Sequence, residues 1–144
     1  MSSSLRPPAP RPCESCPYRR DVPAGVWADE EYAKLARYDA DTPYQPTGTF
    51  QCHQTDADGH SRRICAGWAG CHEGEDLLAL RLAVLGGSMD PATYRAVVEY
   101  ESPVPLFPSG SAAAAHGAAG IPTPSDDARR VINKISRTRG DLVQ

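Results

Sequence analysis

The chain has 144 residues, of which 40% are hydrophobic and 7% aromatic, and its formal net charge is −3. This length predicts one domain with tails, and the 14 prolines and 12 glycines predict short elements around a modest core. The negative charge argues against a general nucleic-acid binder, because nonspecific affinity for nucleic acid comes from a cationic surface.

The sequence gives no sign of a membrane partner. It contains no run of about 18 apolar residues that would span a bilayer, and the first residues lack the apolar segment of a signal peptide. We therefore expect a cytoplasmic protein. Cytoplasmic thiols are kept reduced, so clustered cysteines there are more often metal ligands or redox groups than disulfides. The odd count of 5 cysteines agrees, because they cannot all pair within the chain.

The N-terminal part predicts an arm, a cysteine turn and one helix. Residues 1–12 are rich in proline and are expected to be disordered. Cys13 and Cys16 follow in a turn whose flanking prolines prevent it from continuing as a helix or strand. Residues 27–38 have apolar side chains near helical spacing and acidic residues at their start, which predicts a helix.

The middle of the chain predicts a β-hairpin. Residues 47–52 have the pattern of a short strand, residues 56–60 form a polar turn, and residues 63–65 have the pattern of a partner strand. Cys52 and Cys65 are then expected near the two stems of the hairpin. The glycine-containing segment that follows Cys65 is expected to be a loop.

The rest of the chain is expected to be mostly helical. Residues 76–85 are strongly apolar and predict a buried helix that ends at two glycines. An Asp-Pro pair is a start signal for a helix at residues 92–100. Residues 111–119 are rich in alanine and predict one or two helical turns. Residues 125–139 predict a basic helix with an apolar stripe, and Ser125 is its expected N-terminal cap.

These elements together predict an α+β fold: a small, loop-rich, metal-stapled domain with a short β-hairpin and three to four helices. The expected organisation is a disordered arm at residues 1–12, a metal-cysteine domain at residues 13–120, and a linker with a basic C-terminal helix at residues 121–144. A small domain with a thin core usually needs a staple, and a bound metal ion is one of the common ones.

Four cysteines are the candidate metal ligands: Cys13, Cys16, Cys52 and Cys65. Two thiolates separated by two residues bind one metal ion from a single turn, and two further thiolates complete a tetrahedron. Neighbouring residues on a strand point to opposite faces, so Cys52 and His53 should not both bind one ion. His53 is therefore expected to lie beside the ligands and to hydrogen-bond one of their sulfurs.

Zinc and an iron–sulfur cluster both fit these ligands. The small size of the domain and the Cys-x2-Cys turn favour Zn²⁺, with a [4Fe-4S] cluster as the alternative. The loose spacing of Cys52 and Cys65 and the Cys16-Pro17 step favour the cluster. A thioredoxin-like redox pair is disfavoured, because the Cys-x2-Cys turn does not lie between a strand and a helix.

Three ordered motifs resemble those of a family of small, functionally uncharacterised bacterial and phage proteins. They are Arg-Pro-Cys-x2-Cys-Pro-Tyr-Arg at residues 11–19, Phe-x-Cys-His at residues 50–53 and Cys-Ala-Gly-Trp at residues 65–68. The resemblance covers about residues 11–120 and implies the same four cysteines and His53 as the shared site. Cys71 and His72 are not fixed in that pattern, so they are optional ligands. The family implies no activity.

Basic residues offer a second kind of site. Arg19, Arg20, Arg62 and Arg63 flank the cysteines and could offset the charge of a metal–thiolate centre or bind an anion or partner, although solvated surface arginines are the simpler interpretation. The basic C-terminal helix could contact nucleic acid, but packing against the core or against a protein partner is favoured.

A structural zinc site that supports a binding or interaction module is therefore the leading hypothesis. An iron–sulfur redox or sensor protein is the alternative. A small metal- or thiol-dependent enzyme is the third hypothesis, and it is disfavoured because four cysteine ligands leave no open position for water or substrate. If one of the four did not bind, His53 or Glu14 would become the candidate general base.

Overall fold

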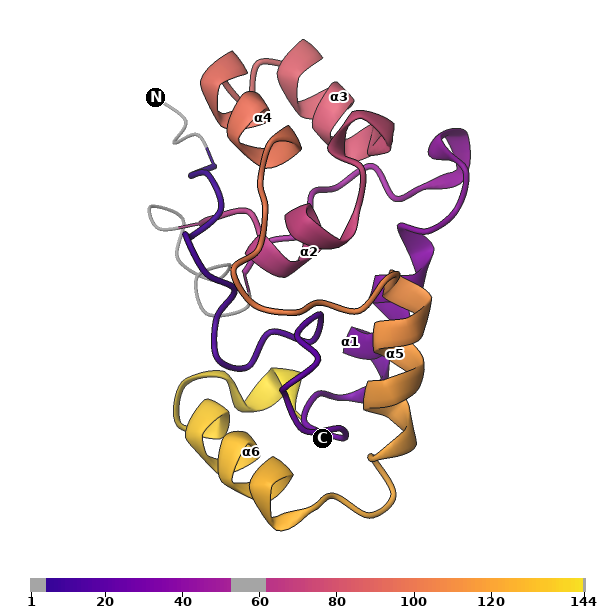
Figure 1. Cartoon of the computed structure of the whole chain (residues 1–144), viewed down its shortest axis with the longest axis vertical. Helices are drawn as coiled ribbons and strands as arrows, with labels where there is room; N and C mark the ends of the chain where they lie inside the picture. Colours follow the sequence, from indigo (N-terminus) through magenta and orange to yellow (C-terminus); the bar gives the residue numbers. More distant parts are fainter. Residues whose placement is uncertain (1–4, 53–61, 144) are drawn as a thin grey trace.

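The computed structural model describes residues 5–52 and 62–143. In chain order the α-helices of this part are α1 (Asp29–Arg37), α2 (Ala66–Cys71), α3 (Leu78–Leu85), α4 (Pro91–Val98), α5 (Gly110–Ala119) and α6 (Asp126–Arg139). Three single 3-10 turns accompany them, namely η1 (Thr42–Tyr44), η2 (Gly74–Asp76) and η3 (Gly140–Leu142). Helices α3 and α4 lie at one end of the molecule, α6 lies at the other, and α5 lies beside α1 (Figure 1).

The predicted α+β fold is wrong, because the described residues are mainly helical and contain only isolated β-bridges. At the predicted hairpin, Gln51 and Ile64 form a single antiparallel bridge. The Cys52 amide donates to the Arg63 carbonyl and the Cys65 amide to the Phe50 carbonyl, each at 2.9 Å. Three residues a side are too few for a stable two-stranded ribbon. The turn predicted at residues 56–60 lies outside the described residues.

The number of helices was also underestimated. The segment after Cys65, expected to be a loop, forms α2, and the alanine-rich segment forms the ten-residue helix α5. Other helix signals are confirmed: the Asp90 side chain accepts from the Thr93 amide at 2.8 Å and caps α4. Ser125 caps α6 in the same way, through the Ala128 amide at 3.1 Å.

The N-terminal arm lies against the segment that leads into α2. The Arg6 amide donates to the Arg62 carbonyl at 3.0 Å, and the Ile64 amide donates to the Arg6 carbonyl at 3.1 Å. Leu5 is buried at the edge of the core. At Arg6 the N-terminal arm therefore lies beside the segment that leads to Cys65.

The C-terminal helix α6 docks on the domain. Its Ala128 is fully buried, and Val131, Ile132 and Ile135 pack against the core. Beyond α6, the Ala28 amide donates to the Leu142 carbonyl at 2.9 Å. The apolar stripe predicted from the sequence is thus the face that contacts the domain.

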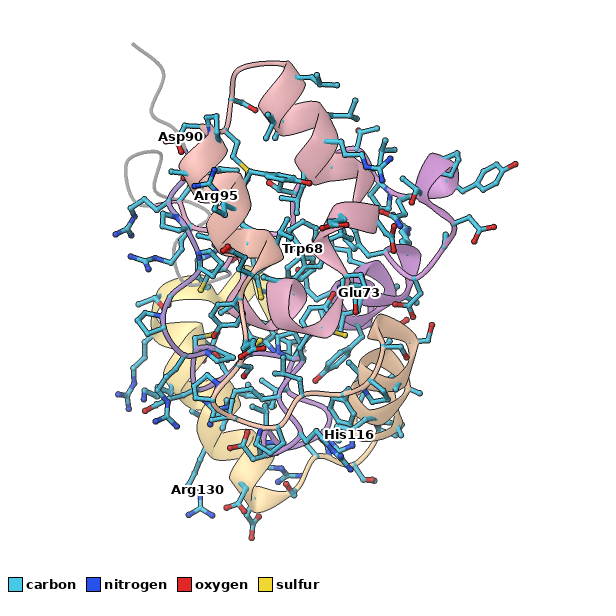
Figure 2. The ribbon with its side chains drawn as sticks, turned by 45° about the horizontal axis from the view of Figure 1, so that its top comes forward. Trp68, Glu73, Asp90, Arg95, His116 and Arg130 are labelled. Atoms are coloured by element: carbon cyan, nitrogen blue, oxygen red, sulfur yellow. The ribbon has the colours of Figure 1, made fainter. Side chains whose placement is uncertain are left out.

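The core is centred on two tryptophans, Trp27 and Trp68, both nearly inaccessible to solvent. Figure 2 shows Trp68, a residue of α2, in the middle of the molecule. None of the helices in the described ranges combines the length and apolar character needed to cross a membrane.

Candidate metal centre

Cys13 and Cys16 lie in two consecutive tight turns. The Cys16 amide donates to the Cys13 carbonyl at 3.0 Å, and the Arg19 amide donates to the Cys16 carbonyl at 3.1 Å. The Tyr18 amide donates to the Cys16 sulfur. The Trp27 indole Nε1–H donates to the Ser15 carbonyl at 3.0 Å, which fixes the turn to the core.

Cys52 and Cys65 come from the two segments joined by the Gln51–Ile64 bridge. Because side chains alternate along extended segments, Cys52 and Cys65 lie on the same side of this pairing. They are diagonal neighbours, since Cys52 pairs with Arg63 and Cys65 pairs with Phe50. Diagonal positions are about 7–8 Å apart, so a group bridging these two cysteines has room between them.

The four cysteines are linked by contacts between their thiols. The Sγ atoms of Cys16 and Cys65 are 3.8 Å apart. The Cys13 thiol interacts with the thiols of both Cys16 and Cys52. The four residues, which we call the thiol cluster, therefore form a continuous series in the order Cys52, Cys13, Cys16, Cys65. Their role as metal ligands stays a prediction.

The thiol cluster is buried on one side. Cys16 and Cys65 are only 1% and 4% exposed, whereas Cys13 and Cys52 are half-buried. The contact with Cys16, together with burial, raises the pKa of Cys13 to about 11, against an opposing effect of Cys52. The Cys13 thiol lowers the pKa of Cys16, but the contact with Cys65 and burial outweigh it and raise this pKa well above its usual range. Binding of a metal ion by these thiols would therefore displace protons near neutral pH.

The contacts within the cluster are pairwise. In residues 5–52 and 62–143, no set of three or more His, Cys, Asp or Glu side chains is already arranged to hold a metal ion. The Cys16–Cys65 contact nevertheless has the right length for one edge of a zinc site, because zinc–sulfur bonds of about 2.3 Å place two tetrahedral ligands about 3.8 Å apart. The four thiols are therefore neighbours but are not oriented toward one point. To bind a single ion, the half-buried thiols of Cys13 and Cys52 would have to turn.

Gly67 is a residue of this site that sequence reasoning missed. A Cβ atom at Gly67 would overlap the Cys16 sulfur and lie 2.8 Å from the Tyr18 Cβ. Helix α2 therefore approaches the thiol cluster at a position where any side chain would collide with a thiol. The glycine in the Cys-Ala-Gly-Trp motif was the available signal, and it was interpreted as part of a loop.

Arg19 supports the Cys13–Cys16 turn. Its guanidinium donates to the Pro12 carbonyl at 3.0 Å and to the Cys13 carbonyl at 3.4 Å, and it pairs with Asp21 at 2.7 Å. The hydrogen bond to Asp21 raises the pKa of Arg19, and the neighbouring Cys16 and Cys13 thiols contribute in the same direction. Arg19 thus lies beside the Cys13–Cys16 turn, and its role in offsetting negative charge there stays a prediction.

The other three arginines are spread out. Arg20 is exposed. Arg62 and Arg63 are neighbours on an extended segment, so their side chains point to opposite sides. The structure therefore gives these arginines separate surroundings, although their function stays a prediction.

Cys71 and His72 have partners outside the thiol cluster. The Cys71 thiol donates to the Phe107 carbonyl at 3.4 Å, and burial raises its pKa to about 12. The His72 ring lies between the Trp68 carbonyl at 3.0 Å and the Asp39 carboxylate at 3.2 Å. His53 lies outside the described residues.

Comparison with known proteins places the chain in a family. DUF6283, a family of unknown function, matches residues 8–139. The chain belongs to the DUF6283 family. The match includes α6, so the part shared with DUF6283 extends beyond the expected limit near residue 120 and takes in the basic helix. No curated protein and no solved structure matches the chain significantly.

Proposed function

We propose that this chain is a small protein folded around one zinc ion bound by Cys13, Cys16, Cys52 and Cys65, and that it acts as an interaction module. The observation that carries the proposal is the thiol cluster itself. Thiols from three separate segments lie in one continuous series, although the two pairs are far apart in the sequence. A bound ion would join these segments and would gain four soft ligands once the half-buried thiols turned toward it.

The length of the Cys16–Cys65 contact favours a single ion over a four-iron cluster. The Sγ separation of 3.8 Å equals the edge of a tetrahedron around one zinc ion. In a [4Fe-4S] cluster each cysteine binds a different iron atom, which holds the sulfurs further apart. We therefore propose zinc, and an iron–sulfur sensor is the outcome that would replace it.

Two groups near the thiols are suited to a negatively charged centre. A zinc ion with four thiolates has a net charge of −2, and such a centre needs hydrogen-bond donors and a cation close by. The Tyr18 amide donates to the Cys16 sulfur, and the Arg19 guanidinium interacts with the Cys13 and Cys16 thiols. These groups would stabilise the negative charge that four thiolates would carry around a bound zinc ion.

A closed shell of four cysteines favours a structural role for the ion, so we propose that function lies in the surface it holds together. A protein partner is favoured over nucleic acid, because acidic residues neutralise much of the basic face of α6. Arg130 pairs with Asp127, and Lys134 pairs with Glu14 at 3.0 Å. Figure 2 shows Arg130 extending away from the body of the molecule.

Metal analysis of protein purified without oxygen tests this proposal. We expect about one zinc ion per chain in the unmodified protein and in a Cys71→Ser control, because the Cys71 thiol binds the Phe107 carbonyl instead. Single changes of Cys13, Cys16, Cys52 or Cys65 to serine should each lower the zinc content. A brown protein that contains iron would favour the cluster, and retention of zinc in all four variants would refute the assigned ligands.

A further inference from the structure

A cavity of about 420 Å³ lies between α3 and residues 47–51, which directly precede Cys52. Its size is within the range of small-molecule sites, about 300–1,000 Å³. The four cysteines are not among its lining residues, so the cavity is separate from the proposed metal centre.

One side of the cavity is polar and carries a cation. Arg62 lines it together with Thr47 and Thr49, and the cavity has no acidic lining residue within the part of the chain that the structure describes. The guanidinium of Arg62 can donate several charge-assisted hydrogen bonds, so a ligand with an anionic group that accepts from Arg62 would be favoured.

Another part of the cavity lining is apolar. It is formed by Ala79 and Ala83 of α3, with Leu82 of the same helix at the rim and 42% exposed. A bare inorganic anion would leave this wall without a partner. A ligand that joins an anionic group to a compact apolar body would satisfy both sides.

We propose that this cavity binds a small organic acid, whose anionic group contacts Arg62 and whose apolar part packs against α3. The recognised chemistry is one carboxylate or phosphate group on a short apolar body. Thr47 and Thr49 also line the cavity, and a threonine hydroxyl can donate a hydrogen bond to such a group. None of the lining residues is a proposed zinc ligand, so the failure of either proposal leaves the other intact.

Nuclear magnetic resonance titration of the full, isotope-labelled chain tests the site. The probes are hexanoate, benzoate and hexyl phosphate, with hexanol as the neutral analogue and inorganic phosphate as the anion without an apolar part. At least one organic acid should shift the amide signals of Thr47, Thr49 and α3 saturably. Arg62→Gln should weaken that binding by about tenfold or more, as expected for loss of a hydrogen bond to a charged group.

Matched variants separate the cavity from general surface charge. Arg63→Gln removes the same charge from the neighbouring residue and should leave the affinity unchanged. Leu82→Glu places a negative charge at the rim and should weaken binding, whereas Leu85→Glu adds it one turn away at a residue that is 83% exposed and does not line the cavity. The proposal would be overturned if Arg62→Gln and Arg63→Gln, or Leu82→Glu and Leu85→Glu, changed the affinity equally. Binding of hexanol as tightly as the organic acids, binding of inorganic phosphate alone, or no binding of any probe would also overturn it.

Discussion

Gly67 allows helix α2 to approach the Cys16 thiol closely. In an ordinary helix, replacing glycine by alanine stabilises by about 1 kcal/mol, because alanine has the higher helix propensity. Here the added Cβ would overlap the Cys16 sulfur. Overpacking of this kind costs about 1–3 kcal/mol. We therefore expect Gly67→Ala to lower the free energy of unfolding and the zinc content, measured by urea denaturation and metal analysis.

The matched control is Gly70→Ala in the same helix. Its Cβ would approach the Leu106 Cδ1 at 2.8 Å, which is the far end of a flexible side chain that can move away. Its effect on stability should be smaller, and its zinc content should be unchanged. A Gly67→Ala variant that is as stable as the unmodified protein and retains zinc would show that α2 does not lie this close to Cys16.

Asp39 links the end of α1 to the start of α5. Its carboxylate accepts from the Gly110 amide at 2.9 Å and the Ser111 amide at 2.7 Å, and it faces the His72 ring. Burial raises the pKa of Asp39, but the hydrogen bonds from Ser111, Gly110 and His72 outweigh it and hold this pKa below its ordinary value.

A carboxyl group with a lowered pKa in the folded state stabilises the fold above its unfolded pKa, near 4. This contribution is lost as the pH falls through the lower, folded pKa. We expect Asp39→Asn to destabilise the protein by about 1 kcal/mol at pH 7, the usual cost of a lost helix cap. The difference from the unmodified protein should shrink with acidification below about pH 4. Urea unfolding of both proteins at each pH measures this difference.

The control for Asp39 is Asp41→Asn, because the Asp41 side chain makes no capping hydrogen bond. Its stability should follow that of the unmodified protein at every pH. A constant difference for Asp39→Asn from neutral to acid pH would contradict the assigned role of the ionised carboxylate.

The sequence was sufficient to nominate the four thiols but not the surroundings that hold them. Cysteine is rare and chemically distinctive, so its spacing is informative by itself. The indole of Trp27 that binds the Ser15 carbonyl, and the glycine that makes room for Cys16, depend on segments that meet only in three dimensions. Such contacts have no local pattern from which they could be inferred.

At the scale of elements, the residues that start and end helices predicted those helices well. The alternation of side chains predicted the length of a strand pairing poorly. The Asp-Pro start of α4 and the Ser125 cap of α6 act locally, so the sequence revealed both. The alternation around Cys52 and Cys65 suggested a hairpin, but the pairing extends over a single bridge before the chain enters α2 at Ala66. A local pattern indicates which residues can pair but does not determine how far the pairing continues.

Helices α1 and α5 approach each other closely because α5 has small residues on the facing side. A Cβ at Gly117 would overlap the Tyr32 ring of α1. We expect Gly117→Ala to destabilise the protein by about 1–3 kcal/mol, although alanine favours an isolated helix. At the exposed position 115 the preference should be reversed, with Ala115→Gly costing about 1 kcal/mol. Thermal or urea unfolding of both variants tests this, and a stabilising Gly117→Ala change would disprove the close approach.

At the scale of the whole molecule, the segments near both ends of the described chain contact segments that hold the cysteines. The N-terminal arm pairs with the Cys65 segment, and the residues after α6 pair with Trp27, whose indole binds the Ser15 carbonyl. Lys134 of α6 also reaches Glu14 within the turn, in an exposed pair that contributes little by itself. The thiol cluster thus lies where the N-terminal, central and C-terminal segments meet, and a bound ion there would stabilise all three together.

Chelation of zinc should therefore unfold more than the cysteine turn. Structural zinc contributes about 10–16 kcal/mol in zinc-finger peptides, which is comparable with the whole stability of a small domain at about 5–15 kcal/mol. We expect a strong chelator to reduce the helical circular dichroism of the unmodified protein cooperatively, and added zinc to restore it. Cys71→Ser should behave in the same way, because its thiol lies outside the cluster. If the zinc were measurably removed and the helical signal persisted, the core around Trp27 and Trp68 would suffice to hold the fold, and the ion would have another role.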